Sequence, residues 1–114
     1  MGAKKLKYVL VADCSGELDA SALIHIGSCV ITSVEVITDG TNGALLKLHN
    51  AITLGTCDAA NKRREVGVAG NAGTATIPNY GGMNWVHPVR CDTGIYCVLS
   101  GTGATYIVDY AIIE

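Results

Sequence analysis

The sequence has little charge, few aromatic rings and almost no proline. Charged side chains make up 16% of its 114 residues, Phe is absent, Trp occurs once and Pro twice. Disordered chains combine low hydrophobicity with high net charge, whereas here the apolar fraction is 49% and the net charge is −2. A disordered tail or linker is therefore excluded. The same charge balance gives no general attraction to nucleic acid or to an anionic membrane.

Long hydrophobic runs are missing as well. Three lysines near the N-terminus precede the apolar run 8–12, which is far too short for the core of a signal peptide. No run approaches the roughly 18 residues of a membrane-spanning helix. We therefore expect a protein that is made in a reducing cytosol and has no membrane partner. Its cysteines are odd in number, so we expect five free thiols rather than a disulfide framework: Cys14, Cys29, Cys57, Cys91 and Cys97.

Glycine is abundant (14 residues), as are Val, Ile and Thr. β-Branched residues suit a pleated sheet and glycine suits the turns between short strands, so the composition predicts an all-β fold. Turn residues recur every 8 to 12 positions, as is typical of an antiparallel β-sandwich. We predict a jelly-roll-like sandwich of about eight short strands, with an N-terminal arm and first strand in 1–19 and the sandwich domain in 20–114. The candidate strands are 7–12, 21–26, 29–38, 44–50, 62–68, 74–77, 84–87, 95–99 and 104–113.

Local patterns add detail to this prediction. The segment 38–43 contains a DG and an NG pair, which predicts a hairpin between the strands on either side. Strict alternation places Val34 and Val36 on one face of their strand and Ile31 on the other. In the following strand it places His49 outward. Gly-Gly at 81–82 predicts a turn, and a short helix is conceivable in 15–22, with Leu18 as its apolar contact.

Several stretches carry a resemblance to a known class of protein. They are 27–36, the Asp-Gly pair at 39–40, 46–50 and, most of all, 93–104, which reads TGIYCVLSGTGA. Together they resemble small β-sandwich virion proteins of tailed bacteriophages, of the capsid decoration (cement) or head-fibre type, in which a "G-[IL]-Y-V-V-L-[ST]-G-T-G-A" segment closes the chain. The chain departs from that pattern at Cys29 and Cys97, where Val or Gly is usual, and in its long middle from 51 to 80.

The resemblance implies a homotrimer or other homo-oligomer that is docked on the major capsid protein or another virion protein and assembled in the host cytoplasm, without catalysis. Apolar residues on both faces of the strand 95–99 also favour an oligomer, because the outer face of a sandwich sheet is normally polar. A tail or fibre accessory protein is an alternative within this class. A different class is a lectin-like jelly roll that binds carbohydrate through Asn71, Tyr80, Asn84 and Trp85.

Candidate chemistry is weak throughout. Metal-ligand types recur at His25-x3-Cys29, His49-x7-Cys57, His87-x3-Cys91 and Cys91-x5-Cys97. On a strand, residues four apart share a face but lie about 13 Å from one another, too far to hold one tetrahedral ion. The glycine-rich segments 67–73 and 101–103 lack the lysine and the helix of a phosphate loop, and no G-x-S-x-G is present. We expect no catalytic residue, metal or cofactor, and a small metal-dependent or cysteine enzyme is the least favoured alternative.

Interaction residues are the remaining candidates. The two concentrations of positive charge could contact an acidic capsid surface or a neighbouring subunit, and the single Trp is either a core residue or the anchor of an interface formed with its neighbours Tyr80 and Met83. The candidates are Lys4, Lys5, Lys7, Lys62, Arg63, Arg64 and Trp85.

Overall fold

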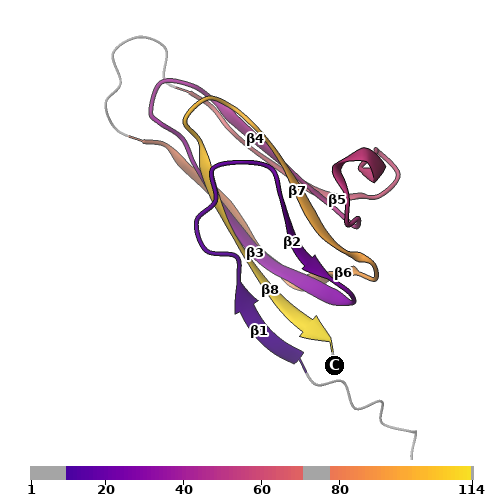
Figure 1. Cartoon of the computed structure of the whole chain (residues 1–114). Coiled ribbons are helices and arrows are strands. Elements are labelled where there is room, and N and C mark those ends of the chain that lie inside the picture. The colour runs from indigo at the N-terminus through magenta and orange to yellow at the C-terminus, as the bar shows by residue number, and fades with distance from the viewer. Residues whose placement is uncertain (1–9, 71–77, 114) are drawn as a thin grey trace, which may run out of the picture.

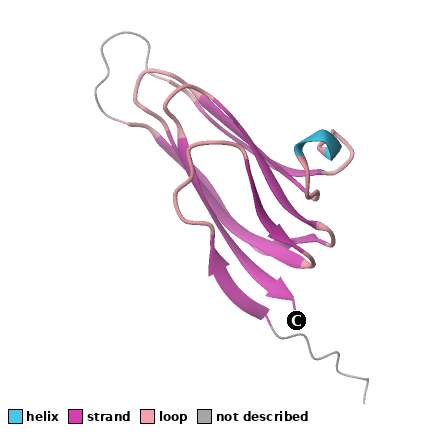
Figure 2. Ribbon diagram, viewed as in Figure 1, coloured by secondary structure: helices cyan, strands magenta, loops and turns pink. Residues whose placement is uncertain are grey.

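The computed structural model describes residues 10–70 and 78–113. These residues form eight β-strands and one 3₁₀ turn (Figures 1 and 2). The elements are β1 (Leu10–Cys14), β2 (Ala22–Ile26), β3 (Cys29–Ile37), β4 (Ala44–His49), η1 (Leu54–Thr56), β5 (Lys62–Val68), β6 (Tyr80–Cys91), β7 (Gly94–Ser100) and β8 (Thr105–Ile113). The all-β prediction is confirmed.

The strands form two antiparallel sheets of four, which pack face to face. One has the order β1-β8-β3-β6 and the other β2-β7-β4-β5. The pairs β1–β8, β2–β7, β3–β6 and β4–β5 are those obtained when the first four strands run antiparallel to the last four and the resulting ribbon is rolled up. This arrangement is a jelly roll. The predicted fold class, an antiparallel β-sandwich of about eight strands, is therefore confirmed.

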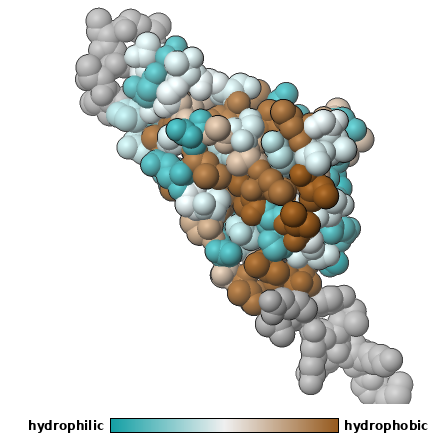
Figure 3. Space-filling view, in the orientation of Figure 1, coloured by the Kyte–Doolittle hydropathy of each residue, from teal (hydrophilic) through white to brown (hydrophobic). Residues whose placement is uncertain are grey.

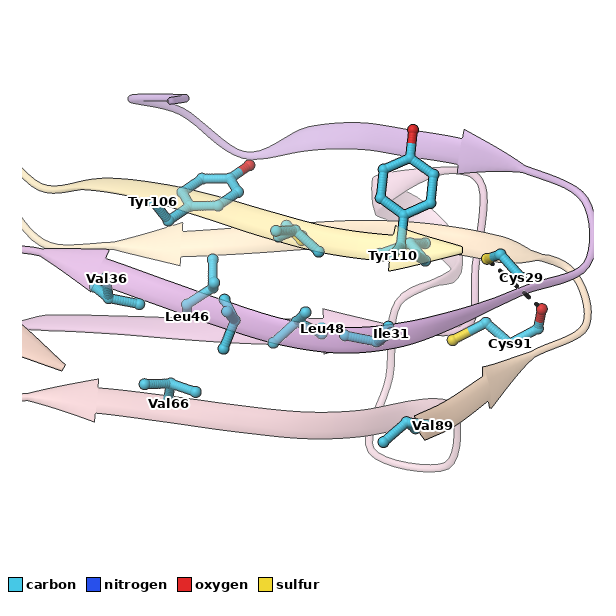
Figure 4. Packing of buried hydrophobic residues seen from close by; sticks show 14 of the residues in the cluster. Cys29, Ile31, Val36, Leu46, Leu48, Val66, Val89, Cys91, Tyr106 and Tyr110 are labelled. Carbon is cyan, nitrogen blue, oxygen red and sulfur yellow. Dashed lines mark hydrogen bonds between the residues drawn. The ribbon is translucent and has the colours of Figure 1, made fainter. Parts of the chain in front are cut away.

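The core lies between the two sheets and is made by side chains that alternate along each strand (Figure 4). Along β8 the inward residues include Tyr106, Val108 and Tyr110, as the alternation predicts. Leu46 and Leu48 face them from β4. The largest fully buried side chains are Tyr106, Ile31, Leu46, Leu48, Ile95, Val36, Val108, Thr38, Cys29, Cys91 and Cys97.

Strict alternation fails in β3, where the prediction was wrong. Ile31, Val34 and Val36 are all buried, although the pattern placed Ile31 on the opposite face from the two valines. The register against both neighbouring strands shifts between Ile31 and Ser33. The extra residue of this bulge, Thr32, exchanges the two faces of the strand, so that Ile31 before it and the two valines after it all reach the core, as Cys29 does.

The turn 38–43 forms as its residues suggest, but it does not make the predicted hairpin. The carboxylate of Asp39 accepts hydrogen bonds from the backbone N–H groups of Thr41 and Asn42, at 2.9 and 2.8 Å. The strands on either side belong to different sheets, since β3 pairs with β6 and β8 whereas β4 pairs with β5 and β7. His49 is also buried rather than outward, because the register shifts after Leu48 and its Nδ1 meets Asn61 Oδ1 at 2.9 Å.

Two further local predictions were wrong. Gly81 and Gly82 lie inside β6 rather than in a turn. A Cβ on Gly81 would lie 2.5 Å from a methyl group of Val68 on β5, so a larger residue here would displace that side chain. The segment 15–22 contains no helix. Leu18 instead exchanges two backbone hydrogen bonds with Tyr106, each 2.9 Å long. The predicted strand 74–77 lies outside the described residues.

Candidate interaction surface

The basic segment predicted to contact a partner begins β5 and is largely engaged within the molecule. Lys62 Nζ lies 3.1 Å from a carboxylate oxygen of Glu65. Arg63 donates to the carbonyl of Ala60, and the guanidinium of Arg64 lies 5.7 Å from the centre of the Trp85 ring. These contacts fit a solvated face as well as they fit a docking site. Lys4, Lys5 and Lys7 lie outside the described residues, so the contribution of all six basic residues stays a prediction.

Trp85 is half-buried and packs against the core. This position agrees with the interpretation of Trp85 as a core residue rather than as the anchor of an interface. The exposed apolar side chains of β6 are instead those on either side of it. Tyr80, Met83 and Val86 have exposed fractions of 64%, 49% and 92%. We call these three residues the β6 ridge. Sequence reasoning had singled out the first two and missed Val86.

The exposure of Val86 follows from an irregularity in the edge strand. β6 pairs with β3 from Tyr80 to Asn84 and again from Val89 to Cys91, and the residues between have no register partner. Pro88 lies in this interval and has no N–H to donate to a ladder, so a break in pairing at an edge strand is its usual setting. Pro88 was the available signal in the sequence, because a proline within a strand indicates an edge position or a break in pairing near it.

A shallow depression of about 300 Å³ lies beside the ridge, between β3 and β6. Its lining includes Tyr80, Asn84, Ser33 and the exposed carboxylate of Glu35. The structure thus brings together two of the four residues predicted for carbohydrate binding. Trp85 is not part of the lining, and Asn71 lies outside the described residues.

The outer face of the β2-β7-β4-β5 sheet is apolar around β7. Ile95 and Cys97 are buried in the core, while Tyr96 and Val98 on the opposite face are only half-buried, as predicted. Leu23 is exposed and stands opposite Tyr96 on β2. Figure 3 shows hydrophobic residues gathered on this side of the molecule, over the position of β2 and β7.

The candidate metal ligands are not assembled into a site in the described part of the chain, where no three of His, Cys, Asp and Glu converge. The His25 ring packs at 5.6 Å, centre to centre, from that of Tyr110, and His49 is bonded to Asn61. All five cysteines are free thiols in the structure. Within the same residues, no helix has the length and apolar character needed to cross a bilayer.

Comparisons with family models, with curated proteins and with solved structures found no match. The fold and the surface together define a small jelly-roll protein with exposed large apolar side chains on several elements, among them three on β6 and two on β2.

Proposed function

We propose that the chain is a non-enzymatic structural subunit of a bacteriophage virion, an oligomeric capsid decoration protein that stabilises the shell. The observation that carries the proposal is the β6 ridge, three exposed apolar side chains on the edge of a jelly roll. Jelly rolls are one of the architectures from which viral capsid domains are built. Large apolar side chains that are exposed along an edge strand offer contact area to a partner. The resemblance of 27–36 and 93–104 to decoration subunits supports the same class.

The two apolar surfaces suit two different contacts. The β6 ridge offers a large aromatic side chain and a methionine, which are enriched at the centres of protein interfaces. The face over β2 and β7 adds Leu23 beside Tyr96. A decoration subunit needs one contact with copies of itself, for which we prefer a trimer, and one with the shell. Because such a protein binds only the assembled shell, mass action shifts the equilibrium toward the assembled state.

The double substitution Met83→Ser/Val86→Ser should weaken binding to shells that lack this subunit, or dissociate the oligomer, by about tenfold or more. Both side chains are exposed, so the fold should survive. Sedimentation measures the oligomer and co-sedimentation with shells of the parent phage measures docking. Leu54→Ser is the matched control, because Leu54 is an exposed apolar residue in η1, outside the ridge. The proposal would be refuted if the unsubstituted protein is a stable monomer at micromolar concentration and does not co-sediment with the shells.

A second candidate function, carbohydrate binding, is favoured by the depression beside the ridge. An exposed tyrosine ring can stack on the apolar face of a sugar ring, while the Glu35 carboxylate and the Asn84 amide can hydrogen-bond to its hydroxyl groups. If this function holds, titration with neutral oligosaccharides should give saturable binding that Tyr80→Ala abolishes and Leu54→Ser leaves unchanged. Binding to shells but not to sugars would decide for the structural role.

A further inference from the structure

Three of the five thiols are buried in the sandwich. Cys29 begins β3, Cys91 ends β6 and Cys97 lies on β7, and each is 0% exposed. Cys29 and Cys91 are direct partners in the antiparallel register of β3 and β6, although 62 residues separate them in the sequence. Both side chains point into the core, and Figure 4 shows them side by side. Cys29 Sγ lies 3.9 Å from the carbonyl oxygen of Cys91.

This arrangement satisfies the main geometric requirement of a disulfide. Directly opposed residues of antiparallel strands have Cα atoms roughly 4.5 to 5.5 Å apart, and disulfides span Cα separations of about 4.4 to 6.8 Å. The two strands would therefore not have to move apart or together by much. The neighbouring Cys91 side chain, together with burial, raises the pKa of the Cys29 thiol.

The end of β6 is also joined to its sheet by few pairings. Beyond the irregularity only three register pairs hold it to β3, namely Cys29 with Cys91, Val30 with Arg90 and Ile31 with Val89. Among the described residues, β6 ends its sheet, and β3 is its one paired neighbour there. Short segments with few pairings open locally at a lower free energy than the whole domain. Such opening gives a small oxidant access to thiols that are otherwise buried.

We propose that Cys29 and Cys91 are the site of a reversible disulfide, which forms on exposure to a low-molecular-weight disulfide such as oxidised glutathione and fastens the end of β6 to β3. One cysteine, as its thiolate, attacks the glutathione disulfide, forming a mixed disulfide and releasing one glutathione thiolate. The other cysteine then attacks the protein-bound sulfur and releases the second. Two protein thiols are oxidised, one glutathione disulfide is reduced, and the two thiol protons pass to the departing thiolates. The proposal does not depend on the proposed function.

The test uses the full chain carrying Cys14→Ser and Cys57→Ser, because these two cysteines are accessible and would take up glutathione themselves. Serine keeps a hydrogen-bonding atom at both positions. Incubation of the folded protein with oxidised glutathione should lower its mass by about 2 Da, for the two hydrogens lost. Peptide mapping should link Cys29 to Cys91 and leave Cys97 open to alkylation. Dithiothreitol should reverse the change.

The disulfide should also raise the melting temperature by about 10 °C, because it restricts a long loop of the unfolded chain. Adding Cys97→Ser to the same chain should leave the reaction intact, whereas adding Cys91→Ser should abolish the loss of mass. Three thiols that stay free in the folded protein, a persistent glutathione adduct, or a link from Cys91 to Cys97 would each overturn the proposal. These three outcomes are all measured on the chain that retains both Cys29 and Cys91, so the test does not require the Cys91→Ser variant to fold.

Discussion

Replacing Tyr106 by Ala is expected to remove about 3 to 5 kcal/mol of folding free energy, the usual loss when a buried aromatic side chain is truncated. Tyr106 is the largest fully buried side chain in the described part of the chain. Its hydroxyl donates a 2.9 Å hydrogen bond to the carbonyl of Ala20. A domain of this length has a total stability of roughly 6 to 17 kcal/mol. The substitution therefore removes a large share of it.

Urea denaturation followed by circular dichroism measures the loss. The matched control is Tyr106→Phe, which keeps the ring and removes only the hydroxyl, and should cost about 0.5 to 1.5 kcal/mol for the lost hydrogen bond to the exposed Ala20. The difference between the two variants isolates the packing of the ring. If Tyr106→Ala costs less than about 1 kcal/mol, the ring does not contribute to the core as the structure has it.

Replacing Gly101 by Ala is expected to cost about 3 kcal/mol or more, through two separate effects. The residue has a φ of +126°, which L-residues rarely adopt. A Cβ at this position would also lie 2.5 Å from the carbonyl oxygen of Gly43 and 2.9 Å from the Cα of Ala44. Both atoms belong to the backbone, so the clash is relieved only by moving the start of β4.

Gly16→Ala separates the two effects. Gly16 also has a positive φ, +72°, but a Cβ there would meet nothing within 4 Å. This variant should lose about 1 kcal/mol, from the backbone conformation alone. Thermal or urea denaturation of both variants gives the comparison. Equal losses would show that the close approach of the loop at Gly101 to β4 does not matter for stability.

Part of the candidate surface could be predicted from the sequence. Tyr80 and Met83 were identified because large apolar residues stood in a polar, glycine-rich stretch. Val86 was missed, since its exposure depends on the loss of pairing around Pro88, and only the partner strand shows where pairing stops. The half-burial of Trp85 depends on Arg64 and the core beneath it, which come from distant parts of the chain.

The sequence by itself determined the approximate positions of most strands and, in β7 and β8, which side chains are buried. The period of two in 105–113 or 95–99 needs no knowledge of neighbours, because a sheet buries one face of each strand whatever pairs with it. The turn at 38–43 also forms from its own residues, through the carboxylate of Asp39.

Only the tertiary structure decided which strands pair. The turn at 38–43 joins two sheets, and the bulge at Thr32 exchanges the faces of β3. Neither could be predicted from the sequence, because alternation shows that one face of a strand is apolar but carries no information about its partner strand or about a single inserted residue. The opposition of Cys29 and Cys91 has the same origin. The two residues are 62 positions apart, and they are paired only because of the way in which the whole chain folds into the jelly roll. Nothing in the local sequence around either thiol indicates that they lie together.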